Sequence, residues 1–294
     1  MRRSLCFRVP AGAVTGAVLV TGTSSGLGQA IALDLAARGA TVLAGVRTVG
    51  TAPSGVGLDG RVHEVQLDVT DPTQIAEAVV SIRRFLGDEH LRGLVNNAGT
   101  AVAGPLEYVD MDELRRQFEV NVFGQLAVTQ GFLELVREHG SGRVVFVSSV
   151  SGRIAAPYVG PYAASKHAVS AMAASLRQEL RPWNIHVSVL EPGNVDTPIW
   201  TKAAERVRYL QAELPALAIE RYGSALERMS RYVDDVAAGR SMTPDQVVRA
   251  ARHALFAADP KPAYVIGGEA RLAVALSRVL PTRTFDLVLD RQTR

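Results

Sequence analysis

Cysteine and long apolar runs are nearly absent from this sequence. Its 294 residues include one cysteine, Cys6, so the chain can form no internal disulfide and no cysteine-based metal site. The six histidines do not cluster at metal-ligand spacings, and we expect no bound metal. No apolar stretch reaches the roughly 18–20 residues that a membrane-spanning helix needs. These absences favour a soluble, cytoplasmic protein without stable membrane insertion.

An excess of charge of one sign is also lacking. Lys and Arg together number 32 against 29 Asp and Glu, which gives a formal net charge of +3. The basic residues are mostly scattered arginines without the runs typical of nucleic-acid-binding proteins, so we expect no nucleic-acid partner. Two early arginines followed by apolar and small residues give the N-terminus some likeness to a signal peptide. We reject that interpretation because residues 17–20 lead directly into a glycine-rich turn that the fold requires.

What the sequence does contain is an alternation of strand-like and helix-like segments. Short apolar β-rich runs are predicted as strands at residues 17–21, 41–46, 62–67, 93–96, 143–148 and 186–191. Alanine-rich segments with helical periodicity lie between them at 28–38, 72–85, 111–138 and 163–181. Nearly continuous apolar strands are typical of sheets buried on both faces. The alternation therefore predicts a parallel sheet with helices on both faces.

The regular pattern weakens after Pro192. We predict a helical insertion over residues 194–243, then a helix at 244–258, a strand at 263–266 and an amphipathic C-terminal extension over 270–294. No linker or repeat divides the chain, so we expect one domain over residues 1–294. Residues 198–240 have two interpretations: a mobile lid over the substrate, or a fixed scaffold whose apolar stripe packs on the core.

A glycine-rich turn follows the first predicted strand. The stretch TGTSSGLG, residues 21–28, places Gly22, Gly26 and Gly28 between a strand and a helix. Glycines let a backbone approach a pyrophosphate closely, and a helix N-terminus supplies N–H groups and positive potential. The spacing is Gly-x-x-x-Gly-x-Gly and not the common Gly-x-Gly-x-x-Gly, so a plain strand–helix turn remains an alternative on this stretch alone.

A tyrosine and a lysine stand four residues apart in PYAASK, residues 161–166. On a helix, Tyr162 and Lys166 would lie on one face, one turn apart. Such a pair arises often by chance, and taken alone it indicates only a surface contact.

Six motifs in a fixed order indicate a functional role for Tyr162 and Lys166. They are TGTSSGLG at 21–28, NNAG at 96–99, VNVFG at 120–124, FVSSVSG at 146–152, PYAASK at 161–166 and EPGNVDTP at 191–198. With these motifs in this order, the chain from residue 15 to 200 resembles the single-domain branch of the short-chain dehydrogenases/reductases. The residues within the motifs are similar to those of the retinol- and steroid-dehydrogenase-like members. The resemblance implies a Rossmann-type, doubly wound, mostly parallel seven-stranded sheet with helices on both faces.

The resemblance also implies catalytic roles for four residues. Tyr162 would be the acid/base for hydride transfer between a nicotinamide and a carbinol carbon, and Lys166 would bind the nicotinamide ribose. An unperturbed tyrosine has a pKa near 10, and we expect the nearby cation to bring it closer to neutral pH. Ser149, selected by its thirteen-residue spacing to the tyrosine, would orient the substrate oxygen. Asn121 would hold a water next to the lysine. We expect Ser148, which precedes Ser149, to lie inside the strand predicted over residues 143–148.

The end of the second predicted strand bears on the choice of cofactor. NAD-binding proteins place an acidic residue there for the ribose 2′-hydroxyl, but Val46 occupies that position and Arg47 follows it. A guanidinium suits a 2′-phosphate, so we expect NADP(H). Asp68 matches the residue that binds the adenine, whereas Asp71 is the better candidate for a helix N-cap. The full set implied for cofactor binding is Gly22, Ser24, Ser25, Gly26, Leu27, Gly28, Arg47, Asp68, Val69, Asn97, Ala98, Gly99, Tyr162, Lys166, Pro192, Gly193, Val195 and Thr197.

The residues expected around the substrate are apolar, apart from Arg153, which we expect to face solvent. They are Ala101, Val102, Ile154, Ala155, Pro157, Tyr158, Val159, Ile199 and Trp200. This composition favours a lipophilic primary or secondary alcohol and its aldehyde or ketone. The alternatives are an NAD-dependent alcohol dehydrogenase of the same fold and a non-catalytic NADP-binding regulator. The resemblance also implies a homo-oligomer, with a dimer favoured, paired through the helices at 111–138 and 163–181.

Overall fold

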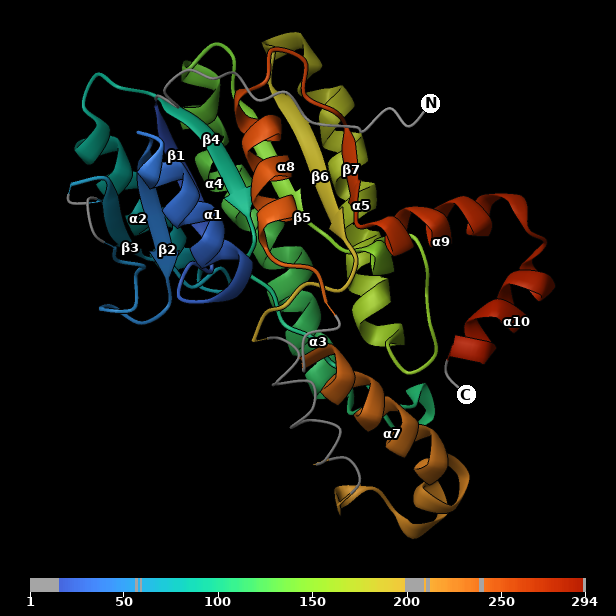
Figure 1. The fold of residues 1–294 in the computed structure, drawn as a ribbon. Helices are drawn as coiled ribbons and strands as arrows, with labels where there is room; N and C mark the ends of the chain where they lie inside the picture. The colour runs from blue at the N-terminus through green and yellow to red at the C-terminus, as the bar shows by residue number, and fades with distance from the viewer. Residues whose placement is uncertain are drawn as a thin grey trace.

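The core of the structure is one parallel sheet. The computed structural model describes residues 16–55, 58, 60–198, 209, 212–237 and 241–292. Its sheet has seven strands in the order β3-β2-β1-β4-β5-β6-β7, and every neighbouring pair is parallel (Figure 1). The order reverses direction between β1 and β4, which is the doubly wound topology that the resemblance implied.

The strands form where the apolar runs predicted them, with small differences at the ends. They are β1 (Ala17–Thr21), β2 (Thr41–Val46), β3 (Val62–Gln66), β4 (Leu91–Asn96), β5 (Arg143–Val147), β6 (His186–Pro192) and β7 (Ala263–Ile266). Strand β5 ends at Val147, so the prediction that Ser148 lies inside the strand is wrong. Every residue of β1 and β5 is buried, as expected for central strands that are covered on both faces.

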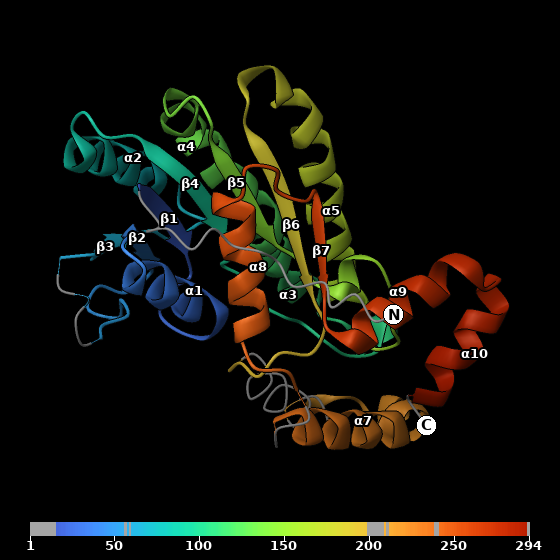
Figure 2. The same ribbon diagram turned by 45° about the horizontal axis from the view of Figure 1, so that its top comes forward.

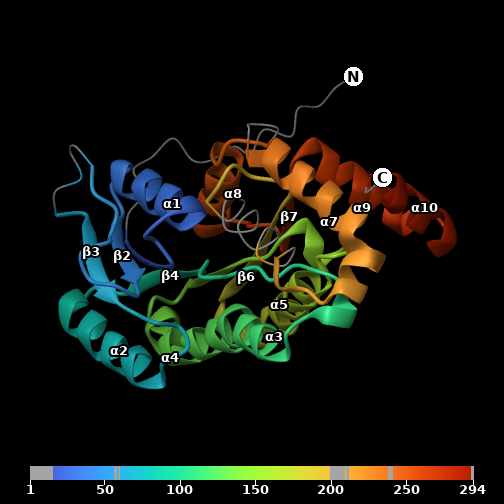
Figure 3. The ribbon, with the colours of Figure 1, turned by 90° about the horizontal axis from the view of Figure 1, so that it is seen from below.

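Helices cover both faces of the sheet (Figure 3). One face carries α1 (Gly26–Ala37) and α8 (Asp245–Phe256), and the other carries α2 (Pro72–Leu86), α4 (Gln125–Glu138) and α5 (Gly160–Glu179). Alternate residues of a strand feed the two cores: Leu19 packs on the side of α2, α4 and α5, and Val18 packs on the side of α1 and α8. Asp71 caps α2 by accepting hydrogen bonds from Thr73 N and Gln74 N, which confirms its predicted role.

The helix predicted over residues 111–138 is not continuous. It consists of α3 (Met111–Phe118), a π-helical segment (η2, Glu119–Gly124) and α4. A Cβ at Gly124 would lie 2.8 Å from both Val69 Cγ2 and Val69 O, so the backbone here approaches the loop after β3 too closely for a larger residue. Apolar periodicity does not reveal this interruption, because the chain stays helical on both sides of it. Segments of this kind occur often at functional sites.

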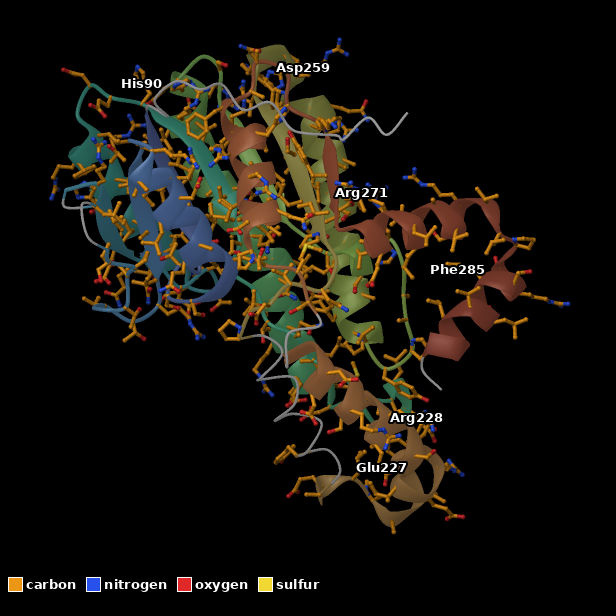
Figure 4. The ribbon with its side chains drawn as sticks, in the orientation of Figure 1. His90, Glu227, Arg228, Asp259, Arg271 and Phe285 are labelled. Atoms are coloured by element: carbon orange, nitrogen blue, oxygen red, sulfur yellow. The ribbon has the colours of Figure 1, made fainter. Side chains whose placement is uncertain are left out.

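Part of the predicted insertion extends beyond the carboxyl edge of the sheet. Within the predicted insertion, α7 (Ala216–Ala237) crosses below the strand ends (Figure 2). In Figure 4, Glu227 and Arg228 of α7 lie at the opposite end of the molecule from His90, which directly precedes β4, and Asp259, in the loop before β7. Residues 199–208, 210–211 and 238–240 lie outside the described residues. Much of the proposed lid, with Ile199 and Trp200, therefore lies outside them too.

The predicted C-terminal extension forms two helices, α9 (Gly268–Val279) and α10 (Thr282–Gln292), which project from the side of the body (Figure 1). Arg271 lies on α9 and Phe285 on α10 (Figure 4). None of the helices in the described ranges is both long enough and apolar enough to span a membrane.

Candidate active site

The glycine turn between β1 and α1 forms a cradle that only glycine permits. Gly22 and Gly26 have φ angles of 66° and 61°, in the left-handed region that other residues rarely adopt. A Cβ at Gly28 would lie 2.2 Å from Gly22 O, so the helix and the turn touch through bare backbone. No side chain caps α1 at Ser25, and its first turn contains no acidic residue. This cradle and the uncapped helix N-terminus fit the pyrophosphate of a dinucleotide.

The NNAG motif joins this turn to the end of β4. Thr21 Oγ1 accepts hydrogen bonds from Asn97 N and Ala98 N, both at 3.0 Å. Asn97 Nδ2 donates to Thr21 O at 2.9 Å and to Gly22 O at 3.1 Å. The ends of β1 and β4 are thereby fixed side by side at the point where the strand order reverses. Thr21, to which the motifs assign no role in the site, organises this junction.

The loop after β6 closes the other side of the cradle. Pro192 ends β6, and Gly193 N donates to Ile266 O at 3.0 Å. Val195 is buried and forms an isolated bridge with Met242. A Cβ at Gly26 would lie 3.6 Å from Thr197 Cβ, so Thr197 lies against the glycine turn. The structure therefore brings these two distant motifs together, as the resemblance implied.

The predicted adenosine end of the site lies at β2 and β3. Asp68 follows β3, and its Oδ1 accepts from Thr70 N at 2.9 Å and from Thr70 Oγ1 at 2.7 Å. Val69 is buried beside Gly124. Arg47 is exposed directly after β2. All three follow the carboxyl ends of β2 and β3, the two strands that lie beyond β1 in the sheet.

Tyr162 and Lys166 lie in the first two turns of α5. This helix begins at Gly160, three residues before the predicted start, with Pro161 in its first turn. Lys166 Nζ lies 5.6 Å from the centre of the Tyr162 ring and donates to Val147 O at 2.9 Å. The lysine is 4% exposed, so its ammonium is removed from solvent at the end of β5. The pair is therefore not the surface contact that the spacing alone would suggest.

Burial shifts the pKa of both groups, in opposite directions. Burial raises the pKa of Tyr162 to about 12, and a hydrogen bond with Ser149 opposes this rise. Burial lowers the pKa of Lys166 to about 8. In the protein by itself, desolvation of the phenolate thus shifts the pKa of Tyr162 upward and not toward neutral pH, as we expected from the nearby Lys166.

Ser149 and Asn121 complete the cluster. Ser149 is 8% exposed, forms the hydrogen bond with Tyr162, and its Oγ accepts from Ser151 N at 3.1 Å. Asn121 lies in the π-helical segment with its side chain fully buried. Its Nδ2 donates to Thr100 O at 2.8 Å and to Ser165 Oγ at 3.0 Å, and its Oδ1 accepts from Thr100 N at 2.8 Å. These bonds hold the π segment against α5.

Gly99 shows how close Asn121 and Lys166 lie to each other. A Cβ on this residue would lie 3.2 Å from Asn121 Oδ1 and 3.7 Å from Lys166 Nζ. Ser165, to which the motifs assign no role, donates from Oγ to Tyr162 O at 2.8 Å and so links Asn121 to the helix of the tyrosine. Its position three residues after Tyr162 is the only sequence signal that could have found it. The predicted residues Asn121, Ser149, Tyr162 and Lys166 form one cluster.

Comparison with known proteins agrees with this geometry. The family model described as short chain dehydrogenase matches residues 16–208. The NADPH-dependent 3-dehydrocapnine reductase of Ornithobacterium rhinotracheale is 33% identical over 276 residues, which cover 92% of this chain and 94% of the reductase. The chain belongs to the short-chain dehydrogenase/reductase family.

Two further relatives support this assignment. Retinol dehydrogenase 5 of Mus musculus is 34% identical over 92% of this chain and 87% of its own length. A solved short chain dehydrogenase from Burkholderia cenocepacia J2315, in complex with NADP, matches with a TM-score of 0.70 and 26% identity over 93% of this chain and 96% of its own. Another structure of the same fold, 22% identical, is in complex with NAD. As a member of this family, the chain is an oxidoreductase that acts on alcohols and ketones and binds a nicotinamide cofactor.

One ion pair of this dehydrogenase/reductase was not foreseen. Arg153 Nε donates to Glu191 Oε1 at 2.7 Å, and the Glu191 side chain is fully buried. The expectation that Arg153 faces solvent is therefore wrong in part: its side chain is one-third exposed, but its Nε is held by a buried carboxylate. A single acidic residue at the end of an apolar strand was the signal that could have indicated this pair. It joins the turn after Ser149 to the end of β6.

Replacing Arg153 by Leu is expected to destabilise the protein, because it leaves the buried carboxylate of Glu191 without its cation. Removing one partner of a buried ion pair costs about 3 kcal/mol or more of unfolding free energy, measurable by urea denaturation. The control Arg115→Leu, which breaks an exposed pair with Asp112, should cost less than about 1 kcal/mol. A double variant, Arg153→Leu with Glu191→Leu, should recover much of the loss. If Arg153→Leu and Arg115→Leu lowered the free energy of unfolding by equal, small amounts, this account would be contradicted.

The described residues contain no group of three or more His, Cys, Asp or Glu side chains that could hold a metal ion. His167, next to Lys166, is exposed and bonds through Nδ1 with Ala163 O at 2.8 Å, away from the catalytic cluster.

Proposed function

We propose that this chain is an NADP(H)-dependent enzyme that interconverts a lipophilic alcohol and its ketone or aldehyde, with Tyr162 as the acid/base. The observation that carries the proposal is the cluster of Tyr162, Lys166, Ser149 and Asn121 at the carboxyl edge of the sheet. This cluster adjoins a glycine cradle that fits a dinucleotide. Binding at the carboxyl edge of an open parallel sheet is the general rule for this topology.

The chain's own residues then move a proton while the bound nicotinamide cofactor supplies or takes the hydride. In reduction, the Tyr162 hydroxyl donates its proton to the carbonyl oxygen. The raised pKa, about 12, keeps this donor protonated at neutral pH. Ser149, already hydrogen-bonded to the tyrosine, orients the same oxygen. A general acid of this kind typically contributes about 10²–10⁴-fold to the rate.

Lys166 supports the phenolate that remains after the transfer. Its ammonium lies one helical turn from Tyr162, in a dry environment where charges interact strongly. The bond from Nζ to Val147 O fixes the ammonium in place. Asn121 and Ser165 hold the first turn of α5 from the other side. The proposed role of Asn121 in holding a water beside Lys166 remains a prediction.

Preference for NADP(H) is supported by the end of β2. Val46 occupies the position of the usual acidic residue, and the exposed side chain of Arg47 makes no hydrogen bond or ion pair within the described ranges. Its five N–H donors are thus available to a 2′-phosphate. The NADPH-dependent relative and the NADP complex of the solved relative support the same choice.

Replacing Arg47 by Ala is expected to weaken NADPH binding far more than NADH binding. A hydrogen bond to a charged group contributes about 1.5–3 kcal/mol, so the preference for NADPH should fall about 10-fold or more. KM and kcat with each cofactor, at one fixed substrate concentration, give the measurement. Arg84→Ala serves as the control, because Arg84 is also exposed but lies on α2, and it should leave the preference for NADPH unchanged. An equal loss for both cofactors would show that Arg47 does not contact the 2′-phosphate.

A lipophilic substrate is supported by the side chains near the cluster. Ala101, Val102, Ile154 and Val159 are partly buried apolar residues in the loops after β4 and before α5. Similarity to a retinol dehydrogenase supports the same substrate class. A panel of lipophilic ketones and aldehydes, compared with sugars and keto acids of similar size, tests it through the rate of NADPH oxidation.

A further inference from the structure

The loop after β2 is held by a carboxylate from the next strand. Glu64, on β3, accepts a hydrogen bond from Gly50 N at 2.8 Å on Oε1 and at 2.9 Å on Oε2. Its Oε2 also accepts from Ala52 N at 2.9 Å. Both carboxylate oxygens of Glu64 thus accept hydrogen bonds from the backbone of a loop that begins with Arg47. Strands β2 and β3 run side by side at one edge of the sheet (Figure 1).

The strand register explains how Glu64 reaches this loop. Glu64 pairs with Ala44 on β2, and the Ala44 side chain packs on the side of α1 and α8. Glu64 therefore projects on the same side, and the loop folds back over it. Gly50 adopts a φ of 85°, and Thr51 Oγ1 donates to Thr48 O at 2.6 Å, which closes the turn. The conformation of the loop therefore directs the backbone N–H groups of Gly50 and Ala52 toward the carboxylate.

The other side of the β2 end is held by the glycine turn. Thr23, fully buried, donates from both N and Oγ1 to Gly45 O at 3.1 Å. Arg47 lies two residues after Gly45. It therefore lies between Gly45, which the glycine turn holds, and Gly50, which Glu64 holds.

Glu64 leaves Arg47 free, although the two have opposite charges. The backbone N–H groups of Gly50 and Ala52 lower the pKa of Glu64, so the side chain is ionised at neutral pH. The carboxylate accepts from those N–H groups, and the structure shows no ion pair between Glu64 and Arg47. The acidic residue thus shapes the loop without occupying the guanidinium.

We propose that Glu64 is a positioning residue for recognition of the cofactor's 2′-phosphate, acting through the Arg47–Ala52 loop. This inference rests on the proposed preference for NADP(H). Without Glu64, the exposed loop would have to be ordered during binding, and the free-energy cost of that ordering would reduce affinity for the phosphate that Arg47 meets. Supporting contacts of this kind hold binding side chains near their productive geometry.

Titration calorimetry with two probes tests the proposal without using activity. Adenosine 2′,5′-bisphosphate carries the 2′-phosphate, and 5′-AMP lacks it. Glu64→Ala should weaken binding of the bisphosphate about 10-fold, the scale of one hydrogen bond to a charged group, and change binding of 5′-AMP less than about 2-fold. Glu64→Gln, whose single amide oxygen can still accept, should fall between Glu64→Ala and the unmodified protein. Glu77→Ala, an exposed acidic residue of α2, controls for the lost charge and should change neither probe.

The coupling to Arg47 distinguishes positioning from a general loss of structure. In an Arg47→Ala background, Glu64→Ala should have little further effect on the bisphosphate, because the group that it positions is gone. Equal weakening of both probes by Glu64→Ala, or fully additive losses in the double variant, would overturn the inference. If Arg47→Ala alone leaves the ratio of the two affinities unchanged, the proposed NADP(H) preference fails first. If that ratio falls but Glu64→Ala does not change it, only the role of Glu64 fails.

Discussion

The Tyr162→Phe enzyme is expected to bind NADPH almost normally and to lose about 10²–10⁴-fold of its turnover rate. The ring still packs at the start of α5, so the fold and the cradle for the cofactor stay intact. Only the hydroxyl is removed, and with it both the proton donor and the hydrogen bond to Ser149. Single-turnover kinetics with a saturating ketone separate this chemical step from the release of product.

Tyr158→Phe is the matched control for this loss. Tyr158 lies four residues before Tyr162, in the loop before α5, and its ring packs at 6.5 Å from that of Tyr222. Removing its hydroxyl takes nothing from the proposed proton path, so the rate should stay within about 10-fold of the unmodified enzyme. Comparable losses in the two variants would remove the assignment of Tyr162 as the acid/base.

The Gly28→Ala chain is expected to lose cofactor binding and to be less stable by about 1–3 kcal/mol, the usual cost of overpacking. The added methyl group would lie 2.2 Å from Gly22 O and 2.4 Å from Asn97 Nδ2. The first contact is with the backbone of the phosphate turn, which cannot rotate away as a side chain could. Relief must therefore come from moving the turn itself, and that movement breaks the cradle.

Gly268→Ala provides the comparison for this variant. A Cβ at Gly268 meets nothing within 4 Å, and the residue begins the exposed helix α9. Thermal unfolding and NADPH titration of the two variants should differ clearly, with Gly268→Ala close to the unmodified protein. NADPH binding that survives in Gly28→Ala would show that the cofactor does not depend on close contact between α1 and the turn.

The parts of the fold that could be predicted are those governed by local rules. Buried parallel strands give continuous apolar runs, so β1 and β5 could be located from the sequence to within a residue or two. Asp71 before Pro72 predicted a helix start, because a carboxylate in that position caps free N–H groups. The spacing from Tyr162 to Lys166 reports their shared helix face directly. In each case the sequence neighbours determine the geometry.

The parts that could not be predicted depend on contacts between distant segments. The π-helical segment around Asn121 arises where Gly124 meets Val69, fifty-five residues earlier in the chain. The ion pair of Arg153 and Glu191 forms only when β6 is laid beside β5. The upward pKa shift of Tyr162 depends on how many atoms surround the phenol, which residue spacing does not encode. Such properties follow from packing and require the three-dimensional structure.

The central claim is that this cluster reduces carbonyl compounds with NADPH, and one measurement tests it most directly. Purified protein is mixed with NADPH and each member of a panel of lipophilic ketones and aldehydes, and loss of the reduced cofactor is compared with the alcohol formed. We predict that at least one compound yields alcohol in equal amount to the NADPH consumed, and that Tyr162→Phe abolishes this reaction while still binding NADPH. Tight binding of NADPH without turnover of any compound would contradict the claim and favour a cofactor-binding regulator.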